Sequence, residues 1–323
     1  MKNKKKLKMR ARGRTAEGTH VPVLVKDILK VLSPQKGEIV ADCTLGFGGH
    51  AARFIDCIGP DGKLVGMDVD GRHLKATSRK LAFQKAATSF HHANFSSIKS
   101  IAEKEGDGGF DILFADLGIS SMQVDDAGRG VSYKNDGPLD MRMDERLEKT
   151  GADILAEFSA EQLSDILWRY SDEPDHEIIA EFIVGQRISK PITRVSELVR
   201  LVMNAKGLTE KTFKKQNKNA SFGSAHPAAR TFQAVRIAVN GEMEALEKLL
   251  ADGPQCLRPD GRIGIMSFQS GEDRLVKEAF RKGLEDGVFR EISPKPIVPD
   301  KWEIMKNPRS SSARFRWARA CCP

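Results

Sequence analysis

The chain has 323 residues, a hydrophobic fraction of 40% and a mean hydropathy of −0.39, which fit a soluble globular protein with one large domain or two ordinary ones. No stretch approaches the roughly 18 apolar residues of a membrane helix, and the first residues lack the apolar run of a secretory signal. A cytoplasmic protein is therefore expected. The five cysteines are scattered without a CxxC pair, so we expect neither a disulfide framework nor a metal site.

The net charge of +8 is concentrated at the amino terminus, where the first 20 residues hold eight Lys or Arg and one Glu. Residues 1–18 are therefore predicted to be a flexible basic tail that adds salt-sensitive attraction to nucleic acid. A purely solubilising tail is the alternative. Residues 206–218 and 301–319 are also basic, and each is either a solvated surface or a contact with a polyanion.

The first half of the chain alternates predicted strands and helices. We expect a helix over 21–32, a second that begins near residue 51, a third that ends near residue 86 and a fourth that precedes residue 112. Strands are expected over 39–41, 64–67, 89–92 and 112–115. This repeat predicts a parallel sheet with right-handed crossovers, in which ligands bind beyond the carboxyl ends of the strands. Four side chains lie just past those strand ends: Asp42, Asp68, Phe95 and Asp116.

A long acidic, glycine-rich segment without helical or strand periodicity follows Asp116. Apolar anchors such as Leu117, Val131 and Leu139 argue against disorder. An ordered loop of this length is usually functional, so the segment predicts a ligand site at the end of the preceding strand.

Residues 151–205 have helical spacing and are predicted to form an α-helical insert. Ser159 and Gln162 form a capping box, Pro174 suits the first turn of a second helix, and Ser196 is expected to cap a third. From residue 227 the α/β pattern returns, with a long helix over 229–250, a turn at 257–261, a strand over 263–268, a helix over 272–284 and an edge strand over 312–318.

The glycine turn after the first strand suits close approach of a ligand to the backbone. Gly46, Gly48 and Gly49 precede a helix whose N–H groups face the turn, although a tight packing turn has the same pattern. Asp68 lies 20 residues beyond Gly48, the spacing at which a carboxylate meets ribose hydroxyls. Because the edge is acidic and no GKS/T motif is present, a phosphate-free, cationic ligand such as S-adenosyl-L-methionine (SAM) fits better than NAD.

Six segments resemble the RsmH (MraW) family in sequence and in order, over roughly residues 19–319. They are TLGFGGH at 44–50, DILFADLGISSMQ at 111–123, DGPLDMRMD at 136–144, TFQAVRIAVN at 231–240, SFQSGEDR at 267–274 and NPR at 307–309. Members of that family are SAM-dependent methyltransferases that act on cytosine N4 in 16S rRNA.

The resemblance implies an α/β fold, a Rossmann-like class I methyltransferase with an inserted α-helical domain. It divides the chain into the tail 1–18, a methyltransferase domain of 19–124 and 226–323, and a helical substrate-recognition domain of 125–225. The SAM contacts that it implies fall on Gly48, Gly49, His50, Asp68, Phe95, Asp116 and Gln123, with Phe95 packed on adenine. Without the resemblance, the glycine neighbours of His50 favour a ligand contact over a local cap, whereas an ordinary core aromatic is the favoured interpretation of Phe95.

The residues that handle the substrate are less well specified. Asp116, Ser120, Ser121 or backbone carbonyls are candidates to accept the proton of the reacting amine. Asp140 and Arg142 are candidates to shape the pocket or hold phosphate, with bracing of the loop as the alternative. The family usually has SFHSLEDR where this chain has SFQSGEDR, so Gln269 is a candidate substrate contact that cannot titrate near neutrality.

The predicted function is transfer of a methyl group from SAM to N4 of a cytidine in the decoding centre of 16S rRNA. The expected partner is the small ribosomal subunit or its late precursor, and the target base is expected to be splayed out of its stack. Two alternatives stay open: the same fold acting on another RNA or DNA amino group, and a weakly active SAM- and RNA-binding ribosome assembly factor. A monomer and a homodimer are both compatible with the sequence.

Overall fold

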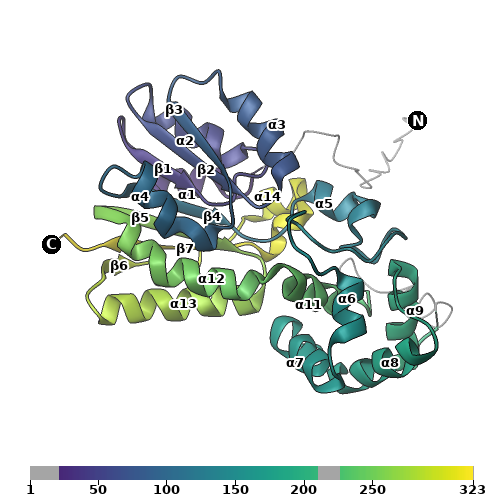
Figure 1. Cartoon of the computed structure of the whole chain (residues 1–323). Helices are drawn as coiled ribbons and strands as arrows, with labels where there is room; N and C mark the ends of the chain where they lie inside the picture. Colours follow the sequence, from purple (N-terminus) through teal and green to yellow (C-terminus); the bar gives the residue numbers. More distant parts are fainter. Residues whose placement is uncertain (1–21, 210–225, 323) are drawn as a thin grey trace, which may run out of the picture.

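The computed structural model describes residues 22–209 and 226–322 (Figure 1). The predicted tail and most of the basic segment 206–218 lie outside the described residues. Within them, no helix is long and apolar enough to cross a membrane, and all five cysteines are free thiols.

The described residues form a seven-stranded sheet with the order β3-β2-β1-β4-β5-β7-β6. The neighbours from β3 to β5 pair in parallel, and β7 pairs antiparallel with both β5 and β6. The strands are β1 Ile39–Asp42, β2 Lys63–Asp68, β3 Ala87–His92, β4 Phe110–Asp116, β5 Leu257–Ser267, β6 Phe289–Ile292 and β7 Arg314–Ala320. The predicted parallel α/β sheet is confirmed for its first five strands. The strand order reverses between β1 and β4, which makes their carboxyl ends the expected ligand position.

Helices cover both faces of the sheet because successive strand residues point to opposite sides. Val40 packs with α1 and α2, whereas Ala41 belongs to the core beneath α4, α12 and α13. Figure 1 shows α12 and α13 side by side along one face. The flanking helices are α1 Val25–Leu32, α2 Gly49–Ile58, α3 Gly71–Leu81, α4 Ile98–Glu105, α12 Glu242–Asp252 and α13 Ser270–Glu285.

A second core lies among the helices of the middle segment, away from the sheet (Figure 1). Its helices are α6 Gly151–Glu157, α7 Ala160–Ser171, α8 His176–Ser189, α9 Val195–Ala205 and α11 Ala229–Asn240. Val131, Leu139, Met141 and Met143 anchor the long loop to this core. Because α11 shares the core, the helical region takes in residues beyond 225; the domain boundaries themselves stay predictions.

Several predicted element boundaries are wrong for identifiable reasons. The predicted helix 229–250 is two helices, because Gly241 adopts a left-handed φ of 57° that ends α11 and begins α12. Ser196 does not cap α9, which begins at Val195; Glu197 accepts the N–H groups of Thr193 and Arg194 instead. Pro174 lies two residues before α8, outside its first turn.

The carboxyl-terminal strand is not at the edge of the sheet, as its alternating aromatic and basic residues suggested. β7 lies between β5 and β6. Phe315 is fully buried on one face, and the Arg316 guanidinium is accommodated on the other by Asp273, with Nε and Oδ1 2.7 Å apart. β5 also begins earlier than predicted, at Leu257, which pairs with Phe110.

The remaining elements are short. They are η1 Phe95–Ser97, α5 Ser121–Asp125, η2 Ala127–Arg129, η4 Gly253–Cys256, α14 Lys301–Lys306 and η5 Pro308–Ser312. Two of them, α5 and η2, lie within the loop that was predicted to be irregular.

Candidate functional site

The carboxyl ends of β1, β2 and β4 bring three predicted acids to one edge. Asp42 is opposite Phe114 in the β1–β4 register, two residues before Asp116, and opposite Gly66 in β2, two residues before Asp68. Thr44 links two of these ends, because its N–H donates to Asp42 Oδ1 at 3.1 Å and its Oγ1 accepts the Asp116 N–H at 2.6 Å. The edge predicted from strand order is therefore a connected set of side chains.

The glycine turn wraps over this edge and starts α2. Gly48 has a φ of 72°, and a Cβ at that position would lie 2.8 Å from Thr77 Cγ2, so a side chain is excluded on both conformational and steric grounds. Gly48 is the N-cap of α2 and makes no side-chain cap. The first N–H groups of α2, from Gly49 and His50, thus begin at the ligand edge.

Asp68 holds the turn as well as standing at the predicted ribose position. Its Oδ2 accepts the Gly46 N–H at 2.7 Å, and its Oδ1 accepts the Asp70 N–H at 2.8 Å. Burial raises the pKa of Asp68 to about 6, although the two backbone hydrogen bonds oppose that shift. Each oxygen has a second lone pair that can accept from a ligand hydroxyl.

Asp70 organises a neighbouring network that the sequence did not indicate. Its carboxylate caps α3 and also accepts Gln123 Nε2 at 3.0 Å and Arg129 Nη2 at 2.6 Å. Gln123 Oε1 in turn accepts the Ser120 N–H, which completes the capping box of α5. Gln123 therefore joins α5 to α3. The partnership of Asp70 with Arg129 spans 59 residues, and no local pattern could have revealed it.

His50 and Phe95 lie at different positions along the edge. His50 is 7% exposed, with its Nε2 3.7 Å from Asp116 Oδ2, and its ring centroid lies 4.8 Å from that of Phe114. Phe95 is the first residue of η1, beyond the end of β3, and packs partly against the core under the sheet. The structure thus brings His50 and Asp116 together, while Phe95 lies at the β3 side.

Buried acids give this edge unusual titration behaviour. Burial, with added repulsion from Asp68, raises the pKa of Asp42 to about 7. Burial also raises the pKa of Asp116 well above its usual range, with Asp42 and Glu272 adding to the effect. Glu272, which the sequence analysis missed, has a pKa raised to about 7 by burial. Such a cluster favours a cationic ligand, because a nearby positive charge lowers the cost of ionising the acids.

Glu272 accepts the N–H groups of Phe268 and Gln269 at the start of α13, so its main structural role is a cap. The Gln269 side chain Oε1 accepts Gln233 Nε2 at 2.7 Å. Gln233 also lines a cavity of about 220 Å³ between the long loop and α11. The other lining residues are Val124, Val131, Ser132, Tyr133, Lys134, Ala229, Phe232 and Arg236.

The remaining candidates lie in the loop. Arg142 donates to both oxygens of Asp140, with Nε–Oδ1 and Nη2–Oδ2 distances of 2.8 and 2.9 Å, and to the Leu147 carbonyl at 2.8 Å. These contacts favour bracing of the loop over a free phosphate contact. Ser120 is the N-cap of α5 and its Oγ accepts the Gln123 N–H; Ser121 is the first residue of that helix.

Comparison with known proteins points to one family over almost the whole chain. The profile of the MraW methylase family matches residues 17–321. A relative named ribosomal RNA small subunit methyltransferase H, from Sorangium cellulosum, is 38% identical over 300 residues, which cover 93% of this chain and 90% of the relative. Proteins of the same name from Clostridioides difficile and Synechococcus elongatus are 36% and 38% identical. Those alignments cover 93% and 94% of this chain, and 98% and 95% of the relatives.

Proposed function

The chain belongs to the MraW methylase family and is a SAM-dependent rRNA methyltransferase; we propose that it methylates N4 of a cytidine in the decoding centre of 16S rRNA. The proposed substrate is the small ribosomal subunit or its late precursor, encountered in the cytoplasm. The relatives' shared name and the six sequence segments support the rRNA substrate.

The acidic edge at the β1–β4 switch point is the observation that carries the cofactor assignment. The Gly48 turn starts α2 at this edge without a side chain, and the acids Asp42 and Asp68, whose pKa values are raised by burial, lie at the neighbouring strand ends. These features suit a ligand that has a ribose and positive charges but no phosphate. Asp68 would accept ribose hydroxyls, and Phe95 would pack on adenine. When bound, SAM supplies an electrophilic methyl group.

The protein has to position the amine and take up its proton. The cytosine N4 lone pair is delocalised into the ring, so orientation contributes much of the rate. We assign the proton to the Asp116 carboxylate, because it stands at the carboxyl end of β4, where Thr44 Oγ1 accepts its backbone N–H and His50 Nε2 lies 3.7 Å from its Oδ2. Ser120 is less suited, since its Oγ already accepts a backbone N–H.

The cavity beside α11 is the proposed position of the splayed cytosine. Gln233 and Arg236 of α11 and Tyr133 of the long loop line it. The Gln233 amide nitrogen already donates to the Tyr170 carbonyl and Gln269 Oε1, so its oxygen is the group that can accept from a base edge, and the Tyr133 ring can stack on the base. Gln269 reaches this cavity only through Gln233. The Asp140–Arg142 pair is assigned to bracing.

Deletion of the gene tests the function directly. We expect N4-methylcytidine to disappear from digested 16S rRNA in nucleoside mass analysis, and to return with the wild-type gene. Asp116→Asn, which keeps the side-chain size, should express as a folded protein and restore little methylation.

Other results would select the alternatives. Unchanged N4-methylcytidine after deletion contradicts the proposal, and loss of a different methylated nucleoside indicates another amino group as the target. Altered subunit assembly with every methylated nucleoside intact favours an assembly factor.

A further inference from the structure

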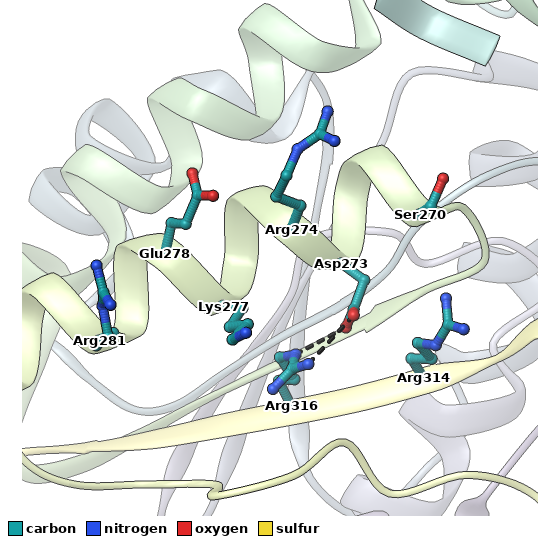
Figure 2. A pocket seen from close by; sticks show the side chains of 8 residues that line it. All are labelled: Ser270, Asp273, Arg274, Lys277, Glu278, Arg281, Arg314 and Arg316. Atoms are coloured by element: carbon teal, nitrogen blue, oxygen red, sulfur yellow. Dashed lines mark hydrogen bonds and ion pairs between the residues drawn. The ribbon is translucent and has the colours of Figure 1, made fainter. Parts of the chain in front are cut away.

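A basic groove lies between α13 and β7 (Figure 2). Its volume is about 490 Å³. The residues that line it are Ser270, Asp273, Arg274, Lys277, Glu278, Arg281, Arg314 and Arg316. Five of these eight side chains are cationic and two are acidic, so the groove has a surplus of positive charge.

Two regular elements fix the positions of these cations. Arg274, Lys277 and Arg281 are spaced by three and four residues, which puts them on one side of α13. Arg314 and Arg316 alternate along β7 and extend toward the helix in Figure 2. The stripe on α13 is about 10 Å long, since a helix rises 1.5 Å per residue.

Part of this charge is already neutralised within the protein. Asp273 binds the Arg316 guanidinium through both oxygens, at 2.7 and 3.1 Å, and Glu285 lies 3.6 Å from Arg281. Within residues 22–209 and 226–322, no carboxylate lies within ion-pair distance of Arg274, Lys277 or Arg314. These three exposed cations are therefore available to an external anion.

The groove begins next to the proposed methyl-transfer site. Arg314 is opposite Ser267 in the β5–β7 register, and the preceding β5 residue, Met266, is opposite Asp116 of β4. One strand, β5, lies between Arg314 on β7 and Asp116 on β4. Because neighbouring strands are about 4.8 Å apart, the backbones of these two residues are about 10 Å apart. A polyanion bound in the groove would thus pass close to a base held at the acidic edge.

We propose that this groove binds the phosphodiester backbone of the substrate RNA beside the nucleotide that is methylated. The inference rests on the proposed function. Flexible cations without a fixed amide or aromatic partner suit phosphates, which position a nucleic acid without specifying its sequence. SAM has no phosphate, so the groove serves the substrate and not the cofactor.

The test compares two triple variants of the full-length protein. Arg274, Lys277 and Arg314 are changed to Gln in the groove variant. In the control variant, Lys36, Lys85 and Lys104 are changed to Gln; these exposed lysines lie near the amino ends of the strands. Both variants lose three positive charges, so a difference between them reports on position and not on net charge. Binding to small ribosomal subunits is measured between 50 and 200 mM salt (about the range used for such slopes), and SAM binding by calorimetry.

We expect the groove variant to lower the slope of log affinity against log salt by about 2, because each phosphate contact contributes roughly 0.7–0.9. Its KM for subunits should rise about tenfold or more, with kcat at saturating subunit and SAM affinity unchanged. The control variant should match the wild type in all four quantities. Equal slopes for the two variants would overturn the proposal. So would competition by polyaspartate that matches competition by an RNA oligonucleotide, because the groove would then accept any polyanion.

Failure of the groove and failure of the function are distinguishable. If wild-type protein binds subunits but leaves them unmethylated, the proposed function fails while the salt slopes still decide the groove. If wild-type protein methylates subunits and the groove variant does so with the same KM, the function stands and the groove proposal is wrong.

Discussion

The acidic edge and the basic groove lie on the same border of one sheet, yet they are built in opposite ways. Asp42 and Asp68 are buried, and backbone N–H groups hold their carboxylates in place. Lys277 and Arg314 are exposed and lack a carboxylate partner among the described residues. Buried acids are costly and need defined hydrogen bonds, whereas exposed cations cost little and bind through many weak contacts.

This contrast indicates how one sheet edge can sort two ligands. A compact ligand with positive charges gains from the buried acids, and phosphates are repelled from them. A polyanion gains from the groove, where Arg274 and Lys277 on α13 and Arg314 on β7 lack a carboxylate partner among the described residues. On the proposal that the groove binds the RNA backbone, the separation of charge keeps RNA phosphates away from the cofactor position while the base itself reaches it.

Among the variants considered, Asp68→Ala is expected to have the largest effect on the acidic edge. The substitution removes the acceptor of the Gly46 and Asp70 N–H groups and the proposed ribose ligand. Because charge-assisted hydrogen bonds contribute about 1.5–3 kcal/mol each, we expect SAM affinity to fall about 10- to 100-fold in calorimetry.

Asp61→Ala is the matched control, since Asp61 is an exposed acid in the turn before β2. It should leave SAM affinity unchanged, and the salt slope for subunit binding should be unaffected by either variant. Unaltered SAM binding by folded Asp68→Ala would remove Asp68 from its assigned role.

A change of pH should affect the acidic edge but not the basic groove, without any mutation. The pKa values of Asp42, Asp68 and Glu272 are raised to about 7, 6 and 7, above the value of roughly 4 in an unfolded chain. Their stabilising contribution is thus complete below about pH 4 and is lost as pH rises through 6 to 7. Binding of cationic SAM should change in the opposite direction, because ionised acids attract it.

Thermal unfolding between pH 5.5 and 7.5 provides the measurement. The Tm without SAM should fall as pH rises, and the increase in Tm caused by SAM should grow, corresponding to about tenfold tighter binding. Asp42→Asn should flatten both trends. Lys and Arg do not titrate in this range, so the groove's salt slope should stay constant. A SAM effect that shrinks with rising pH would contradict the electrostatic account.

The acidic edge was predictable because it depends on strand order. Alternating strands and helices place every parallel strand's carboxyl end on one border, so Asp42, Asp68 and Asp116 had to gather there once the strands were located. The glycine turn was likewise recognisable, because few other backbone conformations require several glycines so close together.

What the sequence did not reveal depends on packing between distant segments. Arg129 meets Asp70 across 59 residues, and Asp273 meets Arg316 across 43. That second pair is the reason why β7 can lie inside the sheet although its arginines suggested an edge. Glu272 was missed because its burial depends on how α13 packs. Its neighbour Gln269 drew attention only through the family resemblance.

The smallest expected effect compares two arginines in different surroundings. Arg142 is held by Asp140 and the Leu147 carbonyl, whereas Arg314 has no carboxylate partner within residues 22–209 and 226–322. Arg142→Ala should therefore lower the free energy of unfolding by about 1 kcal/mol and leave the salt slope for subunit binding unchanged. Arg314→Ala should do the reverse, with a stability change within about 0.5 kcal/mol and a slope lower by roughly 0.7–0.9. Urea unfolding and salt titration of the two single variants measure both quantities.

If Arg142→Ala lowers the salt slope while the free energy of unfolding is unaffected, Arg142 is a phosphate ligand. The basic surface would then extend across the loop to the acidic edge, and the separation of charge would no longer explain how the two ligands are sorted.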